Sequence, residues 1–157
     1  MQGPITEEII FRSAAVPLLV LSGMQLNNII FVTPIIFGLA HIHHFYEFRL
    51  THPHVPITSA IARSLLQLAY TSLFGAYATF LFLRTGSLLS IIIVHAFCNS
   101  MGLPRLWGPV QPSWLPPNQS PLTWTILYYS LLVAGSYIWW QQLWPLTESR
   151  NTAVGWR

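Results

Sequence analysis

Long apolar segments with almost no charged residues occupy most of this sequence. Only 7% of the 157 residues are charged and 53% are hydrophobic, whereas soluble domains are roughly 25% charged. A chain with so few charges cannot cover a water-facing surface while it buries so much apolar side chain. We therefore predict an integral membrane protein of the all-α class, because helices satisfy their own backbone hydrogen bonds in lipid.

The few charged and reactive residues exclude several classes of protein. All seven basic residues are Arg, they stand singly between apolar runs, and the net charge is +3. Nucleic-acid binding requires a clustered basic surface, so we predict no nucleic-acid partner. The single cysteine, Cys98, excludes an intrachain disulfide and any metal site built from several cysteines.

Glycine, proline and polar residues divide the chain into apolar segments. We predict helices over residues 5–22, 26–46 and 57–84, a shorter apolar segment over 87–101, and a last span over 122–146. A polar loop is expected over residues 47–56. The result is a polytopic bundle with about four to five membrane segments around a central polar cavity.

Proline recurs through residues 102–121 and forbids a continuous helix there. We accordingly expect four parts along the chain. These are a membrane core over residues 1–104 that holds the candidate catalytic residues, a Pro-rich loop over 105–121, a C-terminal membrane helix over 122–146 and a polar tail over 147–157.

Two carboxylates and an arginine lie within the first apolar helix. Each of Glu7, Glu8 and Arg12 would cost about 3 kcal/mol in the bilayer unless it is paired or hydrated. Glu8 and Arg12 are four residues apart and share a helix face, so we expect an ion pair that leaves Glu7 as the freer base. A single Glu would more often only cap the helix at the interface, but two with a matched Arg favour a function.

Polar residues on two later segments complete a candidate site. His41 lies at the polar end of the second segment, and His95 and Asn99 share a helix face on a later one. Either histidine alone would more often be an interhelix hydrogen-bonding residue. Together with Glu7, these residues supply the base, the oxyanion donors and the acid that hydrolysis of a peptide bond requires.

The same residue types can also hold zinc, since two His and one Glu with an open position form a hydrolytic zinc site. No His-Glu-x-x-His helix is present, and neither His41 nor His95 has a second histidine four residues further on. His41 and His44, three residues apart, are only a weak candidate pair. We therefore predict a site without metal or other cofactor and keep zinc as the alternative.

Three motifs, in this order, resemble those of the type II CaaX prenyl endopeptidase family, the Ras-converting-enzyme branch of the glutamate intramembrane proteases. They are Glu7-Glu8-x-x-x-Arg12, Phe37-x-x-x-His41 and His95-x-x-x-Asn99. The resemblance covers roughly residues 3–104. Eukaryotic members of the family carry several membrane helices before the Glu-Glu motif, which here begins six residues after Met1, so we expect an N-terminally shortened member.

The resemblance implies a multi-pass endopeptidase of the endoplasmic reticulum membrane. Its substrates would be prenylated CaaX proteins such as Ras-like small GTPases, which lose their C-terminal tripeptide, aaX. The family pattern implies that Glu7 with His41 activates water and that His95 and Asn99 form the oxyanion site. Glu8 with Arg12 would support this geometry.

Two other classes of function use the same residues. A non-catalytic membrane scaffold of the same fold predicts a broken motif set, whereas every motif position here is filled, which favours an enzyme. A transporter that relays protons through intramembrane Glu and His predicts pH-driven flux and no cleavage product.

Overall fold

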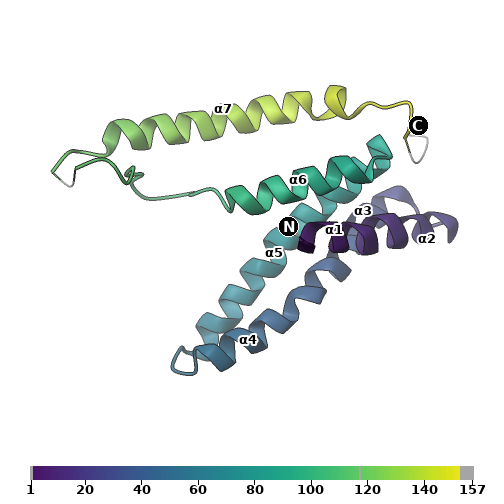
Figure 1. Cartoon of the computed structure of the whole chain (residues 1–157), viewed down its shortest axis with the longest axis horizontal. Coiled ribbons are helices and arrows are strands. Elements are labelled where there is room, and N and C mark those ends of the chain that lie inside the picture. Colours follow the sequence, from purple (N-terminus) through teal and green to yellow (C-terminus); the bar gives the residue numbers. More distant parts are fainter. Residues whose placement is uncertain (1, 117, 153–157) are drawn as a thin grey trace. The chain divides into compact units, whose positions relative to one another are not determined.

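The structure is a computed structural model that describes residues 2–116 and 118–152, and within these ranges it contains helices and connecting loops but no strand (Figure 1). The all-α prediction is therefore confirmed. Contacts divide the chain into two compact units, one with the residues up to Asn99 and those from Ser149 on, the other with Ser100–Glu148.

The first unit begins with three short helical pieces in succession. They are α1 (Gln2–Glu8), the π-helix η1 (Ile9–Ala14) and α2 (Ala15–Leu21). The helix predicted over 5–22 is present, but it begins earlier, at Gln2, and it widens at η1, where the N–H of Ala15 donates to the carbonyl of Ile10. Pro17 follows directly and has no N–H to offer the carbonyl of Ser13, so an α-helical ladder could not run unbroken here.

A long hairpin of two apolar helical rods follows in the first unit, and after it comes α6 (Leu88–Met101), which belongs to this unit up to Asn99 (Figure 1). One rod comprises α3 (Leu26–Leu39), the 3₁₀ turn η2 (Ala40–Ile42) and α4 (His43–Thr51). The other rod is α5 (Ile57–Thr85), and α3 packs most extensively against it.

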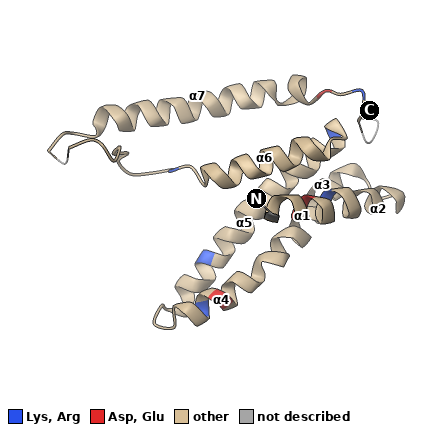
Figure 2. Cartoon of the chain, viewed as in Figure 1, with Lys and Arg blue, Asp and Glu red and all other residues tan. Residues whose placement is uncertain are grey.

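The loop of this hairpin is shorter than predicted. We expected it over residues 47–56, but α4 continues to Thr51. Two contacts stabilise the end of the hairpin: Arg49 Nη1 donates to the carbonyl of Val55 over 2.6 Å, and the Arg63 guanidinium lies 4.4 Å from the centre of the Phe48 ring. Figure 2 shows charged residues gathered at this end of the hairpin and in the N-terminal helices.

Two small groups of buried apolar residues hold these helices together. Val16 of α2, Ile29 of α3 and Leu83 of α5 form one, and Ala78 and Leu81 of α5 with Ile91 of α6 form the other. Between α3 and α5 the hydroxyls of Thr33 and Thr79 also lie 3.3 Å apart, both buried. This packing holds α2, α3, α5 and α6 against one another.

Two helices of the described chain, Leu26–Thr51 and Ile57–Thr85, are long and apolar enough to cross a membrane. α6 is apolar but shorter. Large apolar side chains on these helices are exposed, as Leu73 is at 73%, and such a surface suits lipid rather than water. The predicted total of four to five segments stays a prediction.

The second unit consists of the Pro-rich segment and α7 (Leu122–Thr147). The segment folds back along the first turns of α7, where the hydroxyl of Tyr128 accepts from the N–H of Arg105 at 2.8 Å and Thr125 Oγ1 accepts from the N–H of Val110 at 2.9 Å. α7 begins directly after Pro121, close to the predicted start. It is not one of the two described helices that are long and apolar enough to cross a membrane, since Trp, Tyr and Gln residues interrupt its apolar side chains. Its assignment as a C-terminal membrane helix stays a prediction.

Candidate active site

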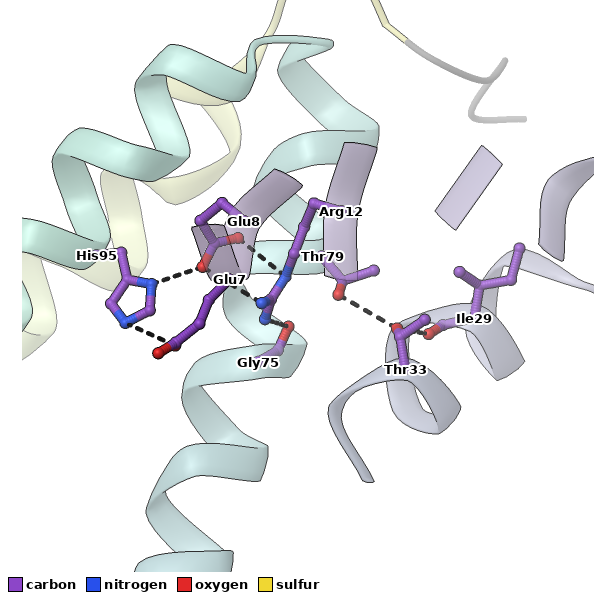
Figure 3. A network of polar contacts seen from close by, with 8 residues as sticks. All are labelled: Glu7, Glu8, Arg12, Ile29, Thr33, Gly75, Thr79 and His95. Carbon is purple, nitrogen blue, oxygen red and sulfur yellow. Dashed lines mark hydrogen bonds and ion pairs between the residues drawn. The ribbon is translucent and has the colours of Figure 1, made fainter. Parts of the chain in front are cut away.

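A buried ion pair between Glu8 and Arg12 lies at the centre of the first unit (Figure 3). Arg12 Nη1 donates to Glu8 Oε1 over 3.3 Å, and Arg12 Nε lies 3.2 Å from Glu8 Oε2. Arg12 also reaches α5, where Nη2 donates to the backbone carbonyl of Gly75 over 3.2 Å. Glu8 is fully buried and Arg12 is 1% exposed, so both charges are removed from water and depend on these partners.

His95 of α6 connects the two carboxylates (Figure 3). Its Nδ1 donates to Glu8 Oε1 over 2.6 Å, a short distance that is typical of charge-assisted hydrogen bonds. Its Nε2 lies 3.8 Å from Glu7 Oε2, which is beyond hydrogen-bond distance. The imidazole is therefore held firmly on the Glu8 side and only loosely on the Glu7 side.

The two adjacent glutamates occupy different environments. Glu8 is buried beside Arg12, whereas the Glu7 side chain is 35% exposed. The expected Glu8–Arg12 pair and the freer Glu7 are both found in the structure. The contact between His95 and Glu8 was not predicted, because the sequence pairs His95 only with residues on its own helix.

Phe37 of α3 joins the second histidine to this group. The Arg12 guanidinium carbon lies 4.7 Å from the centre of the Phe37 ring, and the His41 ring meets the same ring edge-on at 4.8 Å. His41 Nδ1 donates to the carbonyl of Phe37 over 2.8 Å, so its Nε2 is the nitrogen left for other partners. The His95 ring lies 6.3 Å from Phe37, which places both imidazoles around one aromatic side chain.

Asn99 lies one turn after His95 on α6 and is exposed. Among the described residues, the structure brings Glu7, Glu8, Arg12 and His95 into one polar network, with His41 attached through Phe37. Asn99 is on the same helix but outside that network. Its predicted role as an oxyanion donor stays a prediction.

No group of three or more His, Cys, Asp or Glu side chains converges at metal-binding distance within the described ranges. His44, the weak second candidate beside His41, instead lies with its Nδ1 3.1 Å from Glu47 Oε2 in α4. Neither observation tests the prediction of a metal-free site.

Gly75 is a residue of the site that we did not identify from the sequence. Its carbonyl accepts from Arg12, and a Cβ at this position would lie 3.0 Å from Pro34 Cβ and 3.2 Å from Arg12 Nη2. The available signal was a glycine inside a long helix, which indicates close approach of another element without saying which. Only the fold shows that the approaching group is the guanidinium.

Comparison with known proteins places these residues in a named family. Residues 1–101 match the family described as type II CAAX prenyl endopeptidase Rce1-like. No solved structure matches the chain.

Curated relatives carry related names. The chain is 44% identical over 149 residues to "Probable CAAX prenyl protease 2" of Schizosaccharomyces pombe, 47% over 105 residues to "CAAX prenyl protease 2" of Arabidopsis thaliana and 37% over 119 residues to the protein of that name of Homo sapiens. These matches include 95%, 67% and 76% of this chain. They span 51%, 33% and 34% of the three relatives, so the chain corresponds to about half of the first and a third of the others.

Gly75→Ala should destabilise the protein by about 1–3 kcal/mol, because the added methyl group overpacks the contact of α5 with Pro34 and Arg12. Gly135→Ala on α7 is the matched control, since a Cβ there meets nothing within 4 Å. Thermal unfolding in detergent measures both variants. Equal melting temperatures for the two would show that Gly75 is not a close-contact position.

Proposed function

The chain belongs to the Rce1-like family of type II CAAX prenyl endopeptidases, and we propose that it forms the catalytic core of a membrane-embedded protease. In this proposal it hydrolyses the peptide bond after the prenylated cysteine of CaaX proteins and releases the C-terminal tripeptide. The relatives named CAAX prenyl protease 2 support the activity and the substrate class.

One observation carries the proposal. Oε2 of the partly exposed Glu7 and Nε2 of His95 lie 3.8 Å apart. The buried Glu8 holds the other nitrogen of His95 and so keeps the ring in place. The gap leaves Glu7 Oε2 and His95 Nε2 uncommitted to each other, so both atoms are available to water or substrate. Rigid placement of reacting groups is what lowers the barrier of such a reaction.

The proposed reaction uses Glu7 as the general base. Its carboxylate takes a proton from a water molecule as the hydroxide forms a bond to the carbonyl carbon of the scissile peptide. His41, held by the Phe37 carbonyl, orients the water through Nε2. The electron pair of the carbonyl moves onto oxygen, where His95 and Asn99 donate hydrogen bonds, and the C–N bond then breaks as the leaving amine accepts the proton.

Glu8 and Arg12 act in this proposal without touching the substrate. Glu8 accepts from Nδ1 of His95 and so fixes the direction of the ring. Donation from Nε2 to the oxyanion requires a proton on both ring nitrogens of His95, because a neutral imidazole has only one N–H. Arg12 balances the buried charge of Glu8 and ties it to α5 through Gly75. Both are positioning residues.

The membrane setting also favours a lipid-modified substrate. A prenyl chain partitions into the bilayer and brings its adjoining peptide to a protein whose helices lie there. We propose that the protein is a multi-pass component of the endoplasmic reticulum membrane and that Ras-like small GTPases are among its substrates.

Glu7→Gln should lower release of the tripeptide from a farnesylated CaaX peptide by about 100- to 10,000-fold, because it removes the base and keeps the size of the side chain. Glu47→Gln, at an exposed glutamate of α4, is the matched control and should retain activity. Tripeptide release by chain reconstituted in lipid vesicles measures both. Full activity of Glu7→Gln would contradict the assignment of the base.

Addition of a zinc chelator should leave the cleavage rate unchanged, since the proposed mechanism uses only side chains. The same vesicle assay, run with and without chelator and after zinc is restored, measures this. Loss of cleavage with the chelator and its return with zinc would establish the zinc alternative.

A wild-type chain that cleaves no prenylated peptide but carries protons across the vesicle membrane would instead establish the transporter alternative.

A further inference from the structure

A cavity of about 260 Å³ lies in the hairpin between the α3–η2–α4 rod and α5. Its wall is mainly apolar, with contributions from both rods of the hairpin. The lining residues include Gly38, His41, Ile42, Ser64, Leu65 and Leu68. None of the contacts within the Glu7–Glu8–Arg12–His95 network occupies this space, so the cavity is a separate feature beside the site.

His41 belongs to both the cavity and the candidate active site. It lines the cavity, and its ring packs edge-on against Phe37, whose other contacts include Arg12. A ligand in the cavity would therefore have one end next to an imidazole of the site. This continuity indicates that the cavity receives the part of the substrate that adjoins the scissile bond.

Two small residues line the cavity, and they act differently. Gly38 is buried in α3, and a Cβ there would lie 2.6 Å from Leu68 Cδ1 and 2.8 Å from Ser72 Oγ. Ser64 on α5 is half-buried and has only a hydroxymethyl side chain. Gly38 thus lets α3 and α5 pack closely at the edge of the cavity. A larger residue in place of Ser64 would fill part of the space between the rods.

The polarity of the wall selects among the parts of a CaaX substrate. A peptide segment brings N–H and C=O groups, each costly to bury without a partner, and the apolar wall offers few. An isoprenoid chain has no polar group. The cavity also lies between the two helices that are able to cross a membrane, with exposed Ile42 and Leu65 at its wall, so a hydrocarbon chain can enter from lipid.

We propose that this cavity binds the isoprenoid chain of the substrate and that His41 lies beside the peptide bond that follows the prenylated cysteine. The inference rests on the proposed function, and it adds the place where the lipid part of the substrate is recognised. Prenyl-length selectivity then depends on Ser64 and Leu68, which line the cavity.

Photocrosslinking with a CaaX peptide whose thioether-linked isoprenoid carries a diazirine tests the inference. The full chain in lipid vesicles should be labelled within residues 38–46 and 61–68. Ser64→Phe should reduce this labelling by about tenfold, because the ring takes the volume of several buried methylene groups. Ser59→Phe, an exposed position on the same helix outside the cavity, is the matched control and should be labelled like the wild type.

Competition of unlabelled peptides with the photoprobe shows whether the cavity recognises the isoprenoid, any hydrocarbon chain or the peptide. An S-farnesyl peptide should displace the probe, whereas the same peptide with an S-palmitoyl group should not. Equal displacement by both would mean that the cavity is a general groove for acyl chains and would overturn the inference. Displacement that followed the aliphatic residues of the peptide and not the prenyl group would also overturn it.

Cleavage of the same peptide, measured in parallel, separates this inference from the proposed function. Labelling of the cavity by a chain that does not cleave would sustain the inference and contradict the proposed activity. Cleavage together with labelling elsewhere, or with labelling that Ser64→Phe leaves unchanged, would overturn the inference and sustain the activity.

Discussion

The buried ion pair of Glu8 and Arg12 is the interaction on which the arrangement of the helices depends. Removing two charges from water costs several kcal/mol per ion, and only well-placed partners offset that cost. Here the partners come from other helices: the carbonyl of Gly75 on α5, the ring of Phe37 on α3 and the imidazole of His95 on α6. Each helix must sit where it satisfies the pair, so the pair selects one packing among the many that apolar surfaces allow.

The chemistry follows from this constraint. Because Glu8 holds one nitrogen of His95, the other nitrogen is directed toward Glu7, which is the partly exposed carboxylate. Because Phe37 contacts Arg12 and also packs against His41, the second imidazole is placed on the same aromatic ring. The buried Glu8–Arg12 pair, which transfers no proton in the proposed mechanism, thus sets the positions of the residues proposed to act on the substrate.

The sequence predicted the helices and the Glu8–Arg12 pair well, because both are local. Apolar length and helix periodicity place charges on one face of a single helix, but they do not show which other helix that face meets. His95 and Glu8 are 87 residues apart in the sequence, and Arg12 and Gly75 are 63 apart. No local sequence pattern therefore predicts either contact. We did not predict the π-helix at Ile9–Ala14 or the extension of α4 to Thr51. Helix propensities differ too little to locate a π-helical turn or the last residue of a helix.

A double-mutant cycle on the pair tests the central claim most directly, with Glu8→Gln, Arg12→Met and the double variant compared by their free energies of unfolding in detergent. Each single variant leaves one buried charge without its partner and should lose about 3–5 kcal/mol. The double variant should lose far less than the sum of the two, because no unpaired charge remains. Additive losses would show that the two side chains do not depend on each other and would contradict the account.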